Sequence, residues 1–383
     1  MSNELNIAVL GYGMIGRLHS LNYREIPFIY GDSLPRLNLK TIMTSQAKSA
    51  EIAQSEAGFV KAVTTIDDVI NDPEIDVVDI ALPNNMHREA VEKAIAAGKH
   101  VYCEKPLAGT IEDARAIASV VERYRGKAQF GMVFQYRFLP ALIRAKQLIA
   151  EGKIGKTFSY RAEYLHSGYQ DPHRPMSWRM KMEEGGSGAL GDLGSHLIDL
   201  VRFLLGDFSS VQGNLETFIP QRPIAKGSLT MGNVTVDDAA WINARMKNGA
   251  FGSLELSRFA TGTLDDLRIW IYGEYGALHF DLMDPSFLYF FDQKKPGGDY
   301  GGSKGWQRIE TVSFYPNAQT PPPRAPIGWI RSHVENQYQF LKAITSNKQP
   351  SPGISDGLKT QLVLTAVQES AQANGGWLDV ELQ

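Results

Sequence analysis

The sequence predicts an α/β protein in which a doubly wound parallel sheet is followed by a C-terminal α/β domain with a large, mostly antiparallel open sheet. Two observations predict this fold class. Strand-like and helix-like segments alternate through the first third, and strand-like segments follow one another in series later on. Alternation is typical of parallel sheets with crossover helices, whereas strands in series favour antiparallel pairing. We place the boundary so that residues 1–127 form the first domain and residues 128–383 the second.

The first domain is expected to contain short buried strands joined by helices. Apolar runs without two-fold alternation are typical of strands buried on both faces. They cover Leu5–Leu10, Leu39–Met43, Val77–Leu82 and His100–Cys103. Helical segments are expected over Met14–Ile26, Gln46–Ala57, Met86–Ala97 and Ile111–Arg125. A sixth strand near residues 128–133 would complete the sheet.

The second domain is expected to begin with a strand over Lys156–Tyr164 and one amphipathic helix over Gly191–Leu205. Further strands are expected over Val211–Phe218, Val234–Met246, Ala250–Ser257, Leu267–Tyr272, Ala277–Asp281 and Phe287–Phe291. Asn248-Gly249 is a strong hairpin signal, and helices are expected over Ile330–Ile344 and Ser355–Ala373. A sheet with helices on one face leaves the other face uncovered, so we expect a homodimer or homotetramer formed through it.

The composition excludes several classes of protein. The chain has 383 residues, is 43% hydrophobic and 21% charged, and carries a net charge of -3, with no long basic run. Nucleic acid is therefore not an expected partner. The single cysteine, Cys103, excludes an intrachain disulfide and a multi-cysteine metal site. The first residues lack a secretory signal, and no apolar stretch is long enough to span a membrane, so we expect a cytoplasmic protein.

A glycine-rich turn, Gly11-Tyr12-Gly13-Met14-Ile15-Gly16, follows the first strand and opens the first helix. The first glycine allows the tight turn, the second lets the backbone approach a pyrophosphate, and the third lets the helix pack on the strand. The turn therefore predicts a dinucleotide-binding Rossmann domain, an ordinary structural turn being the alternative. The expected cofactor contacts are Gly11, Gly13, Met14, Ile15 and Gly16.

The end of the second strand bears on which cofactor is bound. An acidic residue there favours NAD because it binds the ribose hydroxyl, but this strand ends in Thr44-Ser45. Both hydroxyls can donate to a phosphate, and Lys48 lies one turn later. The cofactor is therefore expected to be NAD(P), with a modest tilt towards NADP(H). The alternative is that Thr44 or Ser45 caps the next helix.

One segment expected near the nicotinamide follows the fourth strand. The fourth strand leads into Leu82, Pro83 and Asn84, and then His87, all expected near the cofactor. Asn84 or Asn85 can instead cap the next helix, and His87 can face either the crevice or solvent.

Glu104-Lys105-Pro106 follows the strand His100–Cys103. A lysine at the carboxyl end of a strand in an open α/β sheet points into the ligand crevice. An ordinary lysine is a solvated surface charge, but this position lets Lys105 orient and polarise a hydroxyl or carbonyl. Glu104 is expected to be structural or to contact the cofactor.

A second candidate group is Asp192 with His196, four residues apart and so on one helix face. A carboxylate beside an imidazole can hold a hydroxyl and transfer its proton, because histidine changes charge near neutral pH. The alternatives are a charge at a helix N-terminus for Asp192, a core histidine for His196, and a metal site.

Taken together, these motifs resemble the Gfo/Idh/MocA oxidoreductases over essentially the whole chain. The resemblance rests on Gly11–Gly16, on Pro83-Asn84 with His87, on Glu104-Lys105-Pro106, and on Gly188–Asp199. Within that family the chain is similar to bacterial sugar dehydrogenases of the levoglucosan dehydrogenase type. This closer likeness rests on Ser177-Trp178-Arg179, Gly186–Asp192 and Phe134-Gln135-Tyr136-Arg137.

The resemblance implies an NAD(P)-dependent dehydrogenase or reductase that transfers a hydride between nicotinamide and a secondary alcohol or ketone of a sugar or cyclitol. It implies that His196 accepts the proton, Lys105 binds the reacting hydroxyl, and Asp192 holds His196 and the substrate, in a cleft between the two domains. Further cofactor contacts are expected from Glu104, Lys105, Gln135, Trp178 and Arg179. Further substrate contacts are expected from Tyr136, Arg137 and His166, with Lys181 nearby.

The chain departs from the family pattern at Thr44, where an acid is absent, and at Gln135, where relatives often carry asparagine. Two other functions stay open for a chain of this kind. One is a same-fold enzyme that uses tightly bound NAD for epimerisation or glycosidic cleavage. The other is a non-catalytic NAD(P)-binding regulator.

Overall fold

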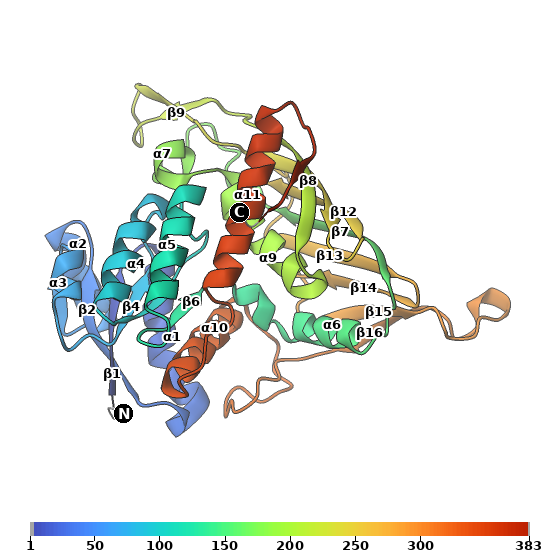
Figure 1. The fold of residues 1–383 in the computed structure, drawn as a ribbon, viewed down its shortest axis with the longest axis horizontal. Coiled ribbons are helices and arrows are strands. Elements are labelled where there is room, and N and C mark those ends of the chain that lie inside the picture. The colour runs from blue at the N-terminus through green and yellow to red at the C-terminus, as the bar shows by residue number, and fades with distance from the viewer. Residues whose placement is uncertain (1–3, 382–383) are drawn as a thin grey trace. The chain divides into compact units, whose positions relative to one another are not determined.

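A computed structural model describes residues 4–381 of the chain (Figure 1). Packing divides the chain into two compact units. Unit 1 contains the chain up to Phe138 together with Phe314–Leu358, and unit 2 contains Leu139–Ser313 together with the chain from Lys359. The expected domain boundary between residues 127 and 128 stays a prediction.

Unit 1 is built on a parallel sheet, which within residues 4–381 has six strands in the order β3-β2-β1-β4-β5-β6. The strands are β1 (Glu4–Leu10), β2 (Arg36–Met43), β3 (Lys61–Val63), β4 (Val77–Ile80), β5 (His100–Cys103) and β6 (Phe130–Met132). From β1 the chain adds β2 and β3 on one side of the sheet and then β4, β5 and β6 on the other side, so the strand order reverses between β1 and β4. Ligands of such sheets bind at this point, beyond the carboxyl ends of the strands. The predicted doubly wound sheet is confirmed.

Helices cover both faces of this sheet. They are α1 (Met14–Tyr30), α2 (Ala47–Ala57), α3 (Ile66–Ile70), α4 (His87–Ala96), α5 (Ile111–Arg123) and α10 (Trp329–Thr345), with short 3₁₀ turns at η1 (Gly31–Ser33), η2 (Asn84–Met86) and η3 (Gln135–Phe138). Successive residues of β1 enter different hydrophobic clusters, because side chains alternate between the faces of a strand. Helix α10 packs on α1, where Tyr30 stacks on Tyr338 with ring centres 3.6 Å apart.

Unit 2 is built on a sheet that, among the described residues, has nine strands in the order β16-β15-β14-β13-β7-β12-β11-β8-β17. The strands are β7 (Thr157–Leu165), β8 (Phe208–Glu216), β11 (Ala239–Met246), β12 (Phe251–Ser257), β13 (Asp266–Gly273), β14 (Gly276–Asp281), β15 (Phe287–Asp292), β16 (Trp306–Glu310) and β17 (Leu378–Asp379). Strands β7 and β12 pair in parallel and the other neighbours pair antiparallel. The predicted mostly antiparallel sheet is confirmed. A separate small ribbon joins β9 (Gln221–Pro223) and β10 (Met231–Asn233).

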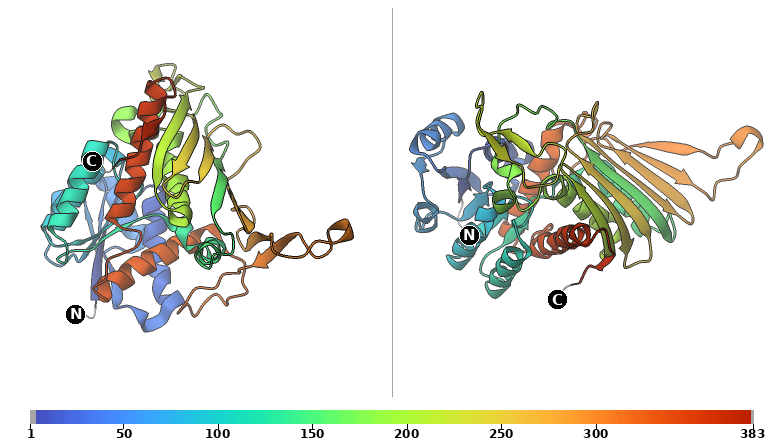
Figure 2. Two further views of the ribbon diagram at one scale, coloured as in Figure 1. Left: turned by 45° about the vertical axis from the view of Figure 1, so that its right-hand side comes forward. Right: turned by 90° about the horizontal axis from the view of Figure 1, so that it is seen from above.

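One face of the nine-stranded sheet is covered by helices (Figure 2). The helices of this unit are α6 (Pro140–Ala150), α7 (Met182–Gly185), α8 (Ala189–Asp192), α9 (Gly194–Leu205) and most of α11 (Ile354–Gln372), with a 3₁₀ turn at η4 (Trp178–Met180) and another at η5 (Asp299–Gly301). Alternate strand residues such as Ile242 and Leu254 are buried, whereas Trp241 is 40% exposed. The prediction of a single helix over Gly191–Leu205 is wrong, because α8 ends at Asp192 and α9 begins at Gly194.

Within residues 4–381, no helix combines the length and the apolar character needed to cross a lipid bilayer.

Candidate active site

The glycine turn leaves room in front of α1. Gly11 has φ +95°, and a Cβ there would lie 2.4 Å from the carbonyl oxygen of Ala81, while a Cβ at Gly16 would lie 2.1 Å from that of Gly11. A Cβ at Gly13 would have no described atom within 4 Å. The first and third glycines are thus required by close packing, and the second faces open space where a pyrophosphate can approach the helix N-terminus. Met14 is exposed and Ile15 half-buried beside this space.

The polar residues after β2 differ in their exposure to solvent. Thr44 is buried, and its hydroxyl donates to the carbonyl of Gln46 at 2.8 Å. Helix α2 has Gln46 as its N-cap, so the alternative that Thr44 or Ser45 caps this helix is wrong. Ser45 and Lys48 are exposed, as a contact with a 2′-phosphate would require.

His87 joins two loops at the edge of the sheet. Its ring is fully buried, with Nδ1 3.1 Å from the carbonyl oxygen of Pro106 and Nε2 3.0 Å from that of Leu82. Burial lowers the pKa of His87, against the opposing effect of these carbonyls. The expectation that His87 faces the crevice or solvent is therefore wrong, because the ring is enclosed between the loops that follow β4 and β5.

The alternative that Asn84 or Asn85 caps the next helix is wrong. The N-cap of η2 is Pro83 and the N-cap of α4 is Met86. Asn84 is buried, so its place at the carboxyl end of β4 is compatible with the cofactor contact expected there. That contact stays a prediction, as does the one from Leu82.

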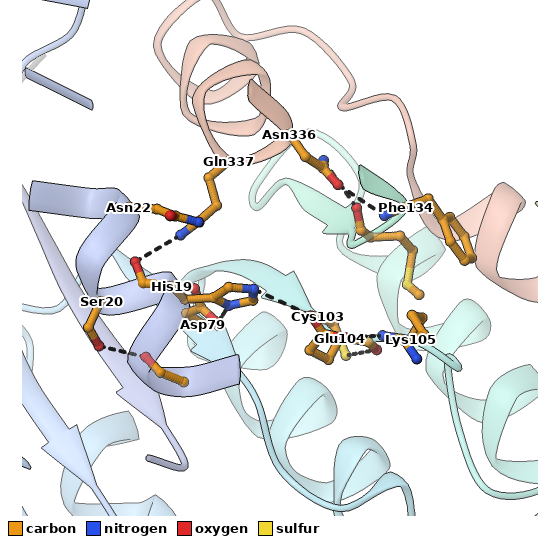
Figure 3. Close-up of polar contacts among 12 residues, drawn as sticks. His19, Ser20, Asn22, Asp79, Cys103, Glu104, Lys105, Phe134, Asn336 and Gln337 are labelled. Carbon is orange, nitrogen blue, oxygen red and sulfur yellow. Dashed lines mark hydrogen bonds and ion pairs between the residues drawn. The ribbon is translucent and has the colours of Figure 1, made fainter. Parts of the chain in front are cut away.

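Glu104 and Lys105 follow β5 directly. The backbone N–H of Glu104 donates to Ile80 at 3.0 Å, which continues the pairing of β4 and β5. The backbone N–H of Lys105 donates to Oε2 of Glu104 at 3.1 Å, and Oε1 of Glu104 lies 3.3 Å from Nε2 of His19 (Figure 3). Glu104 is thus part of a buried ion-paired group, while Lys105 is half-buried.

The segment after β6 is more enclosed than a ligand-lining loop. Gln135, Tyr136 and Arg137 are all buried, and Arg137 donates to Asp356 at 2.8 Å. A substrate contact from Arg137 would therefore compete with an ion pair. The amide oxygen of Gln135 finds no hydrogen-bond partner among residues 4–381. A buried amide without its bonds is costly, which fits a ligand group bonding there.

The second candidate group lies in unit 2. Asp192 is the last residue of α8, and His196 lies in the first turn of α9. A guanidinium nitrogen of Arg258, a residue 1% exposed, donates to Oδ2 of Asp192 at 2.9 Å. Burial alone would lower the pKa of Arg258, but Asp192, together with Tyr169 and Asp237, outweighs burial and raises that pKa. His196 is 8% exposed, and its ring centre lies 6.2 Å from that of Tyr164.

A buried aspartate fixes the start of α8. The two carboxylate oxygens of Asp237 accept the backbone N–H groups of Gly188 and Leu190, each at 2.7 Å. A Cβ at Gly188 would lie 1.7 Å from the backbone oxygen of Asp237, so only glycine fits. Burial raises the pKa of Asp237, and the two backbone N–H groups oppose that shift. The glycine before the Asp192 motif is thus explained by packing.

The remaining predicted ligand contacts lie in the polar segment after β7. His166 is half-buried, and burial lowers its pKa while nearby Asp192 acts in the opposite direction. The guanidinium carbon of Arg179 lies 4.3 Å from the ring centre of Trp178. Lys181 pairs with Glu184 at 2.6 Å. Roles of these residues toward substrate or cofactor stay predictions.

Four residues around the candidate groups were not predicted: His19, Asp79, Asp237 and Arg258. Asp79 carried a signal, because it interrupts an otherwise apolar strand, and Arg258 follows directly after the predicted strand Ala250–Ser257. His19 and Asp237 showed no comparable departure from their surroundings. Among residues 4–381, no group of three or more His, Cys, Asp or Glu side chains is placed to hold a metal ion.

Comparison with known proteins identifies the family. Residues 5–132 match the model of the oxidoreductase family with an NAD-binding Rossmann fold, and residues 142–279 match the Gfo/Idh/MocA C-terminal domain. Levoglucosan dehydrogenase of Pseudarthrobacter phenanthrenivorans is 35% identical over 391 residues, covering 98% of each chain.

Solved structures of similar proteins have the same fold as this chain. A structure of levoglucosan dehydrogenase with NADH has a TM-score of 0.92 at 35% identity, covering 99% of each chain. An NAD binding oxidoreductase from Klebsiella pneumoniae has a TM-score of 0.91 at 31% identity, covering 99% of this chain and 100% of the other. The glycine turn with open space at Gly13 fits the same cofactor. The chain belongs to the Gfo/Idh/MocA family and is an NAD-binding oxidoreductase, a dehydrogenase of CH–OH groups.

Proposed function

We propose that this dehydrogenase transfers a hydride between a nicotinamide and a secondary alcohol or ketone carbon of a sugar, with cyclitols as related substrates. One observation carries the proposal. A relative that matches the whole chain at 35% identity is named levoglucosan dehydrogenase, and its structure with NADH and levoglucosan has a TM-score of 0.91 to this fold. A D-xylose dehydrogenase that is 31% identical over 51% of this chain supports the same substrate class.

The chemistry is assigned to three side chains. His196 accepts the proton of the reacting hydroxyl, since an imidazole gains and loses a proton near neutral pH. Lys105 binds the hydroxyl oxygen and stabilises the negative charge that develops on it. Asp192, held by Arg258 at 2.9 Å, orients His196 and a second substrate hydroxyl. When bound, NAD(P) supplies the acceptor for the hydride.

The cofactor would be held by the glycine turn, by the residues after β4 and β5, and by Gln135, whose amide oxygen has no partner among the described residues. Both NAD and NADP fit the segment after β2, which lacks a carboxylate to repel a 2′-phosphate and exposes Ser45 and Lys48. The Thr44 hydroxyl already donates within its own turn. We therefore assign any discrimination for NADP to Ser45 and Lys48.

Oligomerisation through the nine-stranded sheet is part of the proposal. The face away from the helices carries an aromatic stripe, in which Trp270 stacks on His279 with ring centres 4.6 Å apart and His279 stacks on Tyr289 at 5.6 Å. Arg161 lies over Trp270 at 4.2 Å. Aromatic residues and arginine are enriched in protein interfaces. Light scattering of the purified protein is expected to give a dimer or tetramer, and a monomer at micromolar concentration would remove this part.

The decisive experiment is a substrate screen followed at the absorbance band of reduced nicotinamide. Levoglucosan, L-sorbose, D-xylose and a cyclitol would each be tested with NAD and with NADP. Net formation of reduced cofactor is expected with at least one sugar. Product formation without net reduction would favour epimerisation or glycosidic cleavage with tightly bound NAD. Cofactor binding without turnover of any compound would favour a regulator.

A further inference from the structure

Three ionisable side chains that lie behind Lys105 form a continuous buried group, here called the His19 triad. It consists of His19 on α1, Asp79 on β4 and Glu104 after β5, which are 0%, 0% and 7% exposed. Nδ1 of His19 lies 2.9 Å from Oδ1 of Asp79, and Nε2 lies 3.3 Å from Oε1 of Glu104. Figure 3 shows the histidine ring between the two carboxylates.

The charges of the triad support one another. Burial alone would lower the pKa of His19, but the Asp79 and Glu104 carboxylates outweigh it and raise that pKa to about 10. Burial would raise the pKa of Glu104, but His19 and then Lys105 outweigh it and lower that pKa. His19 is therefore a cation and Glu104 an anion at neutral pH. The contact between them is an ion pair of imperfect geometry, because neither Nε2 nor Oε1 has a well-directed hydrogen bond among residues 4–381.

The rear of the triad is fixed by neighbouring helices and strands. The hydroxyl of Tyr23, one turn after His19 on α1, donates to Oδ2 of Asp79 at 2.8 Å. The ring of Tyr102 lies 5.4 Å from that of His19, between centres. Asp79 lies on a strand between the buried valines and isoleucine of β4. The position of the His19 ring is thus determined by contacts from helix α1 and from strands β4 and β5.

The front of the triad reaches the peptide of Lys105. Glu104 uses its two oxygens for different partners: Oε1 faces His19, and Oε2 accepts the backbone N–H of Lys105 at 3.1 Å. Burying ions is costly, and well-packed apolar residues often give equal or greater stability. The burial of three ions in the core is therefore better explained by positioning than by stability.

We propose that His19 is a positioning residue for Lys105. It fixes the Glu104 carboxylate, and that carboxylate holds the Lys105 backbone where its side chain can bind the reacting hydroxyl. The inference rests on the proposed function, in which Lys105 acts on the substrate. Helix α1, which follows the glycine turn, would then position Lys105 as well as bind the cofactor.

Two substitutions of His19 separate its two contacts. The amide nitrogen of His19→Asn occupies roughly the place of Nδ1 and can still donate to Asp79, but it does not reach Glu104. The longer side chain of His19→Gln can place its amide nitrogen near the position of Nε2 and donate to Glu104. Asn22→Ala is the matched control, because Asn22 is equally buried on the same helix and donates to Gln337 at 2.5 Å instead.

We expect His19→Asn to lower kcat about tenfold and His19→Gln to lower it about threefold or less, since small displacements of a reacting group are costly. Asn22→Ala is expected to keep the wild-type kcat, although it should lose about as much thermal stability as the His19 variants. The Kd for NADH, measured by fluorescence, is expected to stay at the wild-type value in Asn22→Ala and to change less than kcat in the two His19 variants, because the glycine turn is unchanged. Hydrogen exchange of the Lys105 amide is expected to quicken in His19→Asn and not in Asn22→Ala.

Equal loss of kcat in His19→Asn, His19→Gln and Asn22→Ala would overturn the inference, since loss of helix packing would then explain it. Unchanged exchange at the Lys105 amide in a folded His19→Asn variant would also overturn it, whatever sugar is turned over. If His19→Asn fails to fold, Tyr23→Phe tests the same triad from behind Asp79, and an unchanged kcat and exchange rate there count against the inference.

The Lys105→Ala variant distinguishes failure of the inference from failure of the proposed function. Full activity of Lys105→Ala removes the proposed function. Loss of activity in Lys105→Ala beside wild-type activity in His19→Asn removes the inference alone. If His19 acts through Lys105, the double variant should be as slow as Lys105→Ala and no slower, whereas additive losses would place the effect of His19 elsewhere.

Discussion

The two units hold their candidate catalytic groups in different ways. In unit 1, Lys105 is secured through its backbone N–H, which donates to Glu104, and Glu104 is paired in turn with buried His19. In unit 2, Arg258 contacts the Asp192 carboxylate itself at 2.9 Å. A substitution behind Lys105 should therefore move the lysine without changing its chemistry. A substitution of Arg258 should change both the position and the electrostatic environment of Asp192.

The largest effects are expected at the reacting groups themselves. Lys105→Ala and His196→Ala should each lower kcat at least about a hundredfold, because positioned acid–base groups contribute on the order of 10²–10⁴. Circular dichroism and thermal melting should show that both variants remain folded. Near-normal turnover in both would falsify the assignment of these residues in either unit.

The next effect tests whether α8 depends on its close contact with Asp237. Gly188→Ala would place a Cβ 1.7 Å from a backbone oxygen, so the backbone must shift and weaken two hydrogen bonds to a carboxylate. We expect a loss of about 2 kcal/mol in the free energy of unfolding, measured in urea. Gly297→Ala is the control, because its Cβ would meet no described atom within 4 Å. Similar stability of the two variants would show that α8 can move.

Arg258 tests the direct support of Asp192. Arg258→Met should lower kcat about tenfold, since the Asp192 carboxylate would lose the guanidinium that helps to fix its orientation. Arg258→Lys keeps the charge but loses the planar guanidinium, and it should lie between Arg258→Met and the wild type. Measurement of kcat and KM for each variant separates orientation of Asp192 from substrate affinity. Wild-type kcat in Arg258→Met would contradict the view that Arg258 orients Asp192 for catalysis.

The smallest effect concerns two histidines with ring centres 6.5 Å apart. The pKa of His19 is raised to about 10 from the ordinary 6.5, so its stabilising contribution is full below pH 6.5 and is lost as the pH rises towards 10. Burial lowers the pKa of His333 to about 3, against the opposing charge of Glu104, so its neutral form stabilises the fold above pH 6.5. That contribution is lost as the pH falls towards 3.

Urea unfolding of His19→Gln and His333→Gln at about pH 5, 7 and 9 checks these signs. The deficit of His19→Gln against the wild type should shrink from pH 7 to pH 9. The deficit of His333→Gln should shrink from pH 7 to pH 5. Parallel curves for the two variants would contradict the assignment of opposite charge states to the two rings.

Much of the fold was predictable because local patterns were strong. The buried strand His100–Cys103 was predicted with its observed bounds, and the Asn248-Gly249 hairpin joins β11 to β12 as expected. Strand β3 was missed because its three residues are too few to show a period. Helix α6 was missed, although it starts at Pro140, a favourable first helical residue.

The candidate site was predictable as residue types and only partly as environments. The glycine turn, Lys105, Asp192 and His196 stand out in the sequence by type and spacing. The burial of His87 is not evident from the sequence, because a histidine shortly after the end of a strand can face solvent, a crevice or the core. Its ring is enclosed because the carbonyls of Leu82 and Pro106, 24 residues apart, both approach it.

The sequence by itself determined the fold class, the NAD-binding family and the identity of the candidate groups, because these depend on local periodicity and on motifs of fixed spacing. Only the tertiary structure decided what supports those groups. In the His19 triad, His19 contacts Asp79 across 60 positions, and Arg258 contacts Asp192 across 66 positions. A buried charge finds its partner through sheet order and helix packing, and neither is encoded in the spacing of the two residues along the chain.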